Sequence, residues 1–176
     1  YMNADLDIAE WARLSGGLSY EFFRTRGTNW RGPTTLGLDG DRLNPRAALT
    51  ITPIDGIQLF AGYSEGGRPA TLRETLLDMV SLIRPNPLLR PEKSRSIEYG
   101  VNILRDGVIG EDRLKAKLVY FDNRYTDFIM RAYGSFFGLP TEYRTFTNVP
   151  EVRFRGVELS LDYMWRNLFI EGQFSY

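Results

Sequence analysis

Arginine is the residue type whose placement in this sequence most suggests ligand chemistry. Four arginines fall between residues 68 and 90, in a stretch otherwise rich in proline and leucine: Arg68, Arg73, Arg84 and Arg90. A guanidinium group binds carboxylates and phosphates through paired hydrogen bonds, so this stretch could attract an anionic ligand. Glu74 and Asp78 offset part of the charge, and ordinary solvated loop arginines would give the same pattern.

Residues on which many active sites depend are absent. The sequence contains no histidine and no cysteine, which excludes a Ser-His-Asp triad, histidine-ligated zinc and thiolate chemistry within these residues. Glu92 and Glu98 could form a carboxylate pair, but glycoside hydrolysis would also need a cleft and a tuned pKa. We therefore expect no enzymatic activity, no catalytic residue, no metal site and no permanently bound cofactor.

Charge and hydropathy narrow the class of protein. The 176 residues carry 22 lysines plus arginines and 22 aspartates plus glutamates, so net charge gives no reason to expect nucleic acid as a partner. No apolar run approaches the roughly 18 residues of a membrane helix. A membrane β-barrel stays possible, because each of its strands gives only a weak signal. Aromatic residues make up 14% of the chain, which suits the aromatic girdles of such a barrel.

Alternation of apolar and polar residues predicts strands along most of the chain. In residues 96–103, for example, Ile97, Tyr99 and Val101 alternate with polar or small neighbours. The predicted strands cover residues 12–22, 46–52, 57–64, 96–103, 113–120, 157–163 and 168–176. The exception is the stretch 71–83, whose apolar residues recur every three or four positions and allow a short loop helix.

The connections between these strands alternate strictly in length. Three are short (53–56, 105–112 and 165–167) and three are long (23–41, 65–94 and 123–147). Short periplasmic turns and long extracellular loops are typical of an outer-membrane barrel. The sequence thus favours an all-β, antiparallel, up-and-down transmembrane barrel portion of about seven strands, with apolar side chains toward lipid. A soluble β-domain would show the same alternation with inside and outside exchanged.

Two motifs flank the longest connection and resemble TonB-dependent outer-membrane receptors. The first, "RPATLRE", supplies Arg68, Pro69 and Ala70, and is followed by "NPLLRPEKSRSIEYG". The second motif matches the family at these positions: Asn86, Pro87, Leu89, Pro91, Glu92, Ser94, Glu98 and Gly100. The segments "LVYFDNRYTDFI" and "FTNVPEVRFRGVELSLDY" follow in the order the family shows.

The resemblance implies part of a barrel of about 22 strands whose lumen is plugged by a separate domain. Such a receptor lies in the outer membrane of Gram-negative bacteria, contacts outer-membrane lipid and takes up an iron source with energy from the TonB complex. Residues 1–176 would belong to the barrel domain, whereas the plug domain and the segment gripped by TonB are not recognisable in this sequence. A complete eight-stranded barrel without transport activity is the alternative, because "LFIEGQFSY" resembles a barrel's closing strand.

The two motifs are especially typical of haem and haemoglobin receptors, in which a histidine between them commonly ligates the haem iron. Here the only ligand type between them is Met79, and the next outer connection adds Tyr133 and Tyr143. Haem, free or from a haem-carrier protein, is the expected transported ligand, and a ferric siderophore is the alternative. The candidate ligand-binding residues are Arg68, Arg73, Met79, Arg84, Tyr133 and Tyr143.

Overall fold

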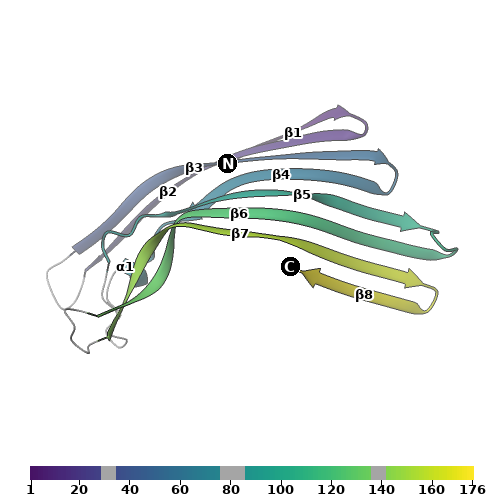
Figure 1. Cartoon of the computed structure of the whole chain (residues 1–176). Coiled ribbons are helices and arrows are strands. Elements are labelled where there is room, and N and C mark those ends of the chain that lie inside the picture. The colour runs from purple at the N-terminus through teal and green to yellow at the C-terminus, as the bar shows by residue number, and fades with distance from the viewer. Residues whose placement is uncertain (29–34, 76–85, 136–141) are drawn as a thin grey trace.

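The computed structural model is one antiparallel sheet of eight strands paired in chain order (Figure 1). It describes residues 1–28, 35–75, 86–135 and 142–176. The elements are β1 (Met2–Ala9), β2 (Ala12–Thr28), β3 (Thr35–Ile54), β4 (Ile57–Arg68), α1 (Leu72–Thr75), β5 (Glu92–Asp106), β6 (Asp112–Ser135), β7 (Glu142–Trp165) and β8 (Leu168–Ser175). The antiparallel all-β fold predicted from the alternation is confirmed.

The sheet has eight strands where about seven were predicted, because β1 is not recognisable from alternation. Its sequence "MNADLDIA" is rich in aspartate and asparagine, which are depleted in strands generally. In this sheet those residues lie on the polar face, where Asn3 accepts a hydrogen bond from Arg46. Asp7 lies opposite Arg13 of β2, and the two side chains form an ion pair of 2.6 Å.

Two of the long connections, predicted at 23–41 and 123–147, are shorter than expected because strands continue through much of each, whereas strands enter the connection at 65–94 only as far as Arg68 and Glu92. β6 and β7 are 24 residues long and pair with each other as far as Ser135 and Glu142. About 9–11 residues suffice to cross a membrane. In a membrane-crossing barrel the extra length would stand in water, where both faces of a strand can be polar, which explains why hydrophobic alternation does not mark it.

The two ends of the sheet differ as the connection lengths predicted. Four tight hairpins close one end, and α1 lies at the other (Figure 1). The β3–β4 turn uses Gly56 at a φ of 74°. The β5–β6 turn is held by Asp112, whose carboxylate accepts hydrogen bonds from the backbone N–H groups of Val108 and Ile109 at 2.6 and 3.0 Å.

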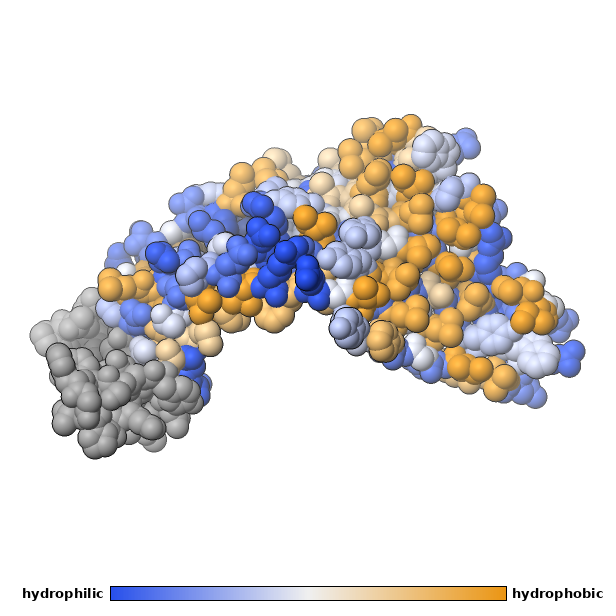
Figure 2. Space-filling view, viewed as in Figure 1, coloured by the Kyte–Doolittle hydropathy of each residue, from blue (hydrophilic) through white to orange (hydrophobic). Residues whose placement is uncertain are grey.

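Register carries the alternation across strands, so that residues of one kind line up in rows. One row on the first face is polar throughout and runs Gln58, Asn102, Lys117, Ser160 and Gln173 from β4 to β8. The neighbouring row on the other face is apolar throughout and runs Leu59, Val101, Leu118, Leu159 and Phe174. Apolar side chains gather over the half of the sheet that carries the hairpins, while polar ones predominate toward the other end (Figure 2).

The sheet is open, and a buried cluster lies at the end of the sheet that carries α1. Ala70, Leu89 and Ile129 form that cluster, with Leu38 and Phe146 packed against it. In the described residues β1 and β8 do not pair with each other, so these eight strands alone are not the closed barrel considered as an alternative. Among the same residues no helix is long and apolar enough to span a membrane.

Candidate functional site

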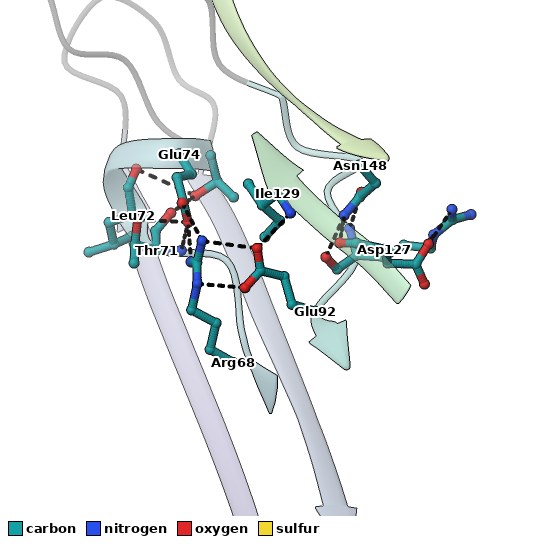
Figure 3. A network of polar contacts seen from close by, with 10 residues as sticks. Arg68, Thr71, Leu72, Glu74, Glu92, Asp127, Ile129 and Asn148 are labelled. Carbon is teal, nitrogen blue, oxygen red and sulfur yellow. Dashed lines mark hydrogen bonds and ion pairs between the residues drawn. The ribbon is translucent and has the colours of Figure 1, made fainter. Parts of the chain in front are cut away.

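The connection between β4 and β5 is fastened where it begins and ends. Arg68, the last residue of β4, lies opposite Glu92, the first residue of β5. The Arg68 guanidinium donates to Glu74 of α1 at 2.9 and 3.0 Å and forms an ion pair of 2.8 Å with Glu92 (Figure 3). We call these three residues the arginine clasp. It ties both ends of the connection and α1 into one unit.

Glu74 also fixes the start of α1. Its carboxylate accepts hydrogen bonds from the backbone N–H of Thr71 at 2.7 Å and from the Thr71 hydroxyl at 3.0 Å. Thr-x-x-Glu is the spacing of a capping box, in which the glutamate returns to the residue preceding the helix. Burial raises the pKa of Glu74, but the hydrogen bonds from Arg68 and Thr71 outweigh it, and the net pKa lies below the usual 4.5.

Glu92 extends the arginine clasp to the neighbouring hairpin. Its side chain is only 8% exposed, and Oε1 accepts a hydrogen bond of 2.6 Å from the backbone N–H of Ile129 in β6. Ile129 belongs to the buried cluster with Ala70 and Leu89, so apolar packing surrounds this carboxylate. Both oxygens of Glu92 therefore have partners, as a buried carboxylate requires.

A second group of contacts holds the segment just before β5. It consists of Asn86, Arg90, Asp127 and Asn148, and we call it the asparagine clasp. The Asn148 side chain accepts from the backbone N–H of Arg90 at 2.8 Å and donates to the carbonyls of Arg90 and Asp127 at 2.9 and 2.6 Å (Figure 3). The Arg90 guanidinium forms an ion pair of 2.6 Å with Asp127. Asn86 donates to the carbonyl of Phe146 at 2.8 Å. Side-chain amides thus bind the segment 86–92 to β6 and β7, as a further strand would be bound.

Comparison with known protein families agrees with this architecture. The family model described as "TonB dependent receptor-like, beta-barrel" matches residues 1–176, the whole chain. The chain belongs to this family. The strands β1–β8 are therefore a portion of a TonB-dependent receptor barrel. We call the face that carries Gln58 and Asn102 the lumen face, because barrels of this kind turn their polar face inward.

Individual proteins resemble this chain in sequence or in structure. A hemin receptor of Yersinia enterocolitica is 31% identical in an alignment of length 129 that covers 65% of this chain and 19% of the relative. A double mutant of the Serratia marcescens hemophore receptor HasR, solved with its hemophore HasA and heme, matches with a TM-score of 0.87 and 26% identity over 99% of this chain and 32% of that one. The siderophore receptor PirA of Acinetobacter baumannii matches with a TM-score of 0.66 and 16% identity over 99% of this chain and 26% of that one, and so shares the fold alone. This chain thus spans between about a fifth and a third of each relative's length.

The family-motif positions of this receptor portion fall into two groups. Most of those between β4 and β5 meet in the clasps or the buried cluster, namely Arg68, Ala70, Asn86, Leu89 and Glu92. Pro69 and Pro91 are half-buried between them, and Pro87 is exposed in the turn that Asn86 begins. Glu98 and Gly100 lie apart, on the lumen face of β5.

Close packing explains why glycine stands at position 100, and this packing does not involve the clasps. Gly100 pairs with Phe60 of β4, whose ring lies over it. A Cβ atom at Gly100 would come within 2.2 Å of the Leu118 carbonyl oxygen and 2.9 Å of the Phe60 ring. Glu98 pairs with Gly62 in the next row of the same face.

The structure places some of the candidate ligand-binding residues and leaves others outside the part that it describes. Arg68 is held between two carboxylates, which compete with any anionic ligand, so a ligand contact through Arg68 stays a prediction. Arg73 is exposed on α1. Met79 and Arg84 lie outside the described residues. Tyr133 and Tyr143 lie near the outer ends of β6 and β7, one register position apart, with Tyr133 opposite Arg144 and Tyr143 opposite Gly134.

Sequence reasoning missed the other partners in the clasps. Thr71 and Glu74 carried a recognisable signal, the capping-box spacing, but Glu74 was read only as a counter-charge to the arginines. Asn148 and Asp127 gave no local signal, because their partners lie 58 and 37 residues away. In the part of the chain that the structure describes, no group of three or more histidine, cysteine, aspartate or glutamate side chains is arranged to hold a metal ion.

Proposed function

We propose that the receptor containing this chain takes up haem across the outer membrane of a Gram-negative bacterium. Its energy comes from the TonB complex, acting through a plug domain that other parts of the protein supply. Haem is the transported ligand and not a resident cofactor, and it arrives free or from a haem-carrier protein. The protein acts as a transporter and not as an enzyme.

One observation carries the choice of haem over other cargo. Relatives named for hemin and for a hemophore match this chain at 31% and 26% identity, whereas the siderophore receptor, at 16%, shares only the fold. The clasps bear on how a ligand site would be held in place and not on the choice of cargo. They fix both ends of the connection between β4 and β5 and join it to the β6–β7 hairpin.

In this proposal the clasps position the ligand-binding residues without contacting haem themselves. Arg73, Arg84, Met79, Tyr133 and Tyr143 are the candidate contacts at the outer end of the barrel. A tyrosine or methionine can ligate haem iron, and an arginine can pair with a propionate. Arg68 contributes through its clasp, because Glu74 and Glu92 already neutralise its charge.

Haem titration of the full-length receptor tests this proposal. We expect saturable binding, seen as a shifted Soret band, and growth on haem as the sole iron source when the receptor gene is expressed. Tyr133→Phe, Tyr143→Phe and Met79→Leu, compared singly, should identify the iron ligand by the loss of that shift in one of them. Competition with a ferric siderophore examines the alternative cargo. Tight binding of the siderophore, with no Soret change on adding haem, would refute haem as the ligand.

A further inference from the structure

Three arginines stand side by side on the outward face of the sheet. Register places Arg95 of β5 opposite Arg124 of β6, and Arg124 opposite Arg153 of β7. Directly opposed like charges destabilise a sheet, because their Cβ atoms lie about 5 Å apart. Anions stabilise such a row by offsetting the repulsion. Each of the three arginines has a carboxylate of the chain within 4 Å.

The neighbouring residues leave this surface basic. Five cations share this part of the outward face, and we call them the outward basic patch: Lys93, Arg95, Arg124, Arg153 and Arg155. Three carboxylates lie on the same face among them, those of Glu65, Asp122 and Glu151. Glu65 and Glu151 approach Arg95 and Arg124 only to 3.8 Å. Asp122 binds Arg153 with two hydrogen bonds, one of 2.8 Å. Arg155 lies opposite Asp122, yet among the described residues no carboxylate accepts a hydrogen bond from it.

The position of the patch relative to the membrane identifies its partner. On the same face, the row next to the leucines contains Tyr99 and Tyr120, whose rings lie 5.1 Å apart as an aromatic girdle does. Arg155 lies one row beyond the tyrosines, about 7 Å farther out, and the row of Arg95 lies about 14 Å beyond them. Deep-blue side chains gather in this zone, between the apolar field and the outer end (Figure 2).

We propose that the outward basic patch binds the phosphate groups of membrane lipids in the leaflet that faces the loops. The patch points away from the lumen, so a transported ligand or a plug domain does not reach it. Its arginines lie just outside the aromatic girdle, where lipid headgroups begin. The side chains of Arg124 and Arg153 are 44% and 41% exposed, and Arg155 is also exposed. Their guanidinium groups can therefore pair with phosphate oxygens.

This inference rests on the proposed outer-membrane location, and its test is kept separate from haem binding. The full-length receptor in detergent is titrated with diphosphoryl lipid A, and bound lipid is counted by native mass spectrometry. Arg124→Gln with Arg155→Gln should weaken lipid binding about 30-fold, about fivefold for each charge lost. Arg155→Gln alone should give the fivefold loss, and it leaves no hydrogen-bonded carboxylate without its partner.

A matched variant controls for charge alone. Lys115→Gln with Lys117→Gln removes two cations from the lumen face of β6 and should leave lipid binding unchanged. Equal loss in both double variants, or no loss in either, would overturn the proposal. So would equal competition by inorganic phosphate at the same phosphate concentration, since it would show binding of phosphate without lipid. Haem titration of the same samples separates the two proposals, because loss of haem binding with lipid binding intact contradicts only the proposed cargo.

Discussion

Arg68 and Glu92 face each other across the outermost register pair of β4 and β5, and their side chains form an ion pair of 2.8 Å. The pair closes the connection between the two strands at its base. Since Glu92 also accepts the Ile129 N–H, the base of the connection is joined to the β6–β7 hairpin as well. We therefore expect a movement at the base of this connection to reach the β6–β7 hairpin.

Replacing Glu92 with glutamine tests this coupling. The variant keeps the side-chain shape but loses the charge that offsets Arg68, and hydrogen bonds to charged groups contribute about 1.5–3 kcal/mol each. Because the change lies outside the apolar band, we expect the barrel to assemble normally. Hydrogen exchange should accelerate at the amide of Ile129 and in residues 86–92 of the full-length receptor.

Glu98→Gln is the matched control for that experiment. Glu98 lies six residues farther along the same strand, on the lumen face and outside both clasps. It should leave exchange at Ile129 unchanged. Identical exchange in the wild type and in Glu92→Gln would show that the arginine clasp does not order this end of the sheet.

The arginine clasp should respond to acid through Glu74. Because its pKa lies below 4.5 in the folded protein, its stabilising contribution is complete above pH 4.5 and is lost as the pH falls through the lowered value. A nitroxide label on Leu72→Cys reports the order of α1 by electron paramagnetic resonance, and the chain has no other cysteine. We expect a constant spectrum above pH 4.5 and a more mobile one in stronger acid.

Glu74→Gln supplies the comparison for the acid experiment. It should make the label mobile at neutral pH and remove the transition associated with this group. A transition of the same size and midpoint in Glu74→Gln would assign the acid response to another residue.

The asparagine clasp predicts a residue-specific result. Asn148→Ala removes the acceptor of the Arg90 N–H and the donor to two carbonyls, which leaves these groups to water at a cost of about 1–3 kcal/mol. The Arg90 amide should exchange faster, and haem affinity should fall without any change in the amount of folded receptor. Asn102→Ala removes an amide bonded to Gln58 at 2.9 Å in the lumen and should leave Arg90 exchange unaffected. Slow exchange at Arg90 in Asn148→Ala would contradict the role given to this clasp.

Particular residues show which parts of this structure the sequence could predict. Ile97, Tyr99 and Val101 alternate with polar neighbours in the apolar band, where lipid and lumen impose opposite requirements on successive side chains. Beyond that band both faces meet water, so residues 123–135 pair as strand without an alternating signal and were expected to form a loop. The clasps were harder still, because Asn148 and Arg90 are brought together by pairing between distant segments. Only the Thr71–Glu74 spacing was visible locally.

Gly100 gives the sharpest test of packing on the lumen face. Gly100→Ala would place a Cβ atom 2.2 Å from the Leu118 carbonyl oxygen, and a backbone group cannot move aside as a flexible side chain can. The strands β5 and β6 must then separate locally, and overpacking of this kind costs about 1–3 kcal/mol. Gly16→Ala is the matched control, since a Cβ atom there would meet nothing within 4 Å.

The measurement is the fraction of full-length receptor that still runs as the folded form on an SDS gel after incubation at a series of temperatures. This fraction should fall at a lower temperature for Gly100→Ala and should match the wild type for Gly16→Ala. Equal thermal resistance of both variants would mean that the Phe60 ring and the adjacent backbone yield easily, and that the close approach at Gly100 does not constrain the wall of the barrel.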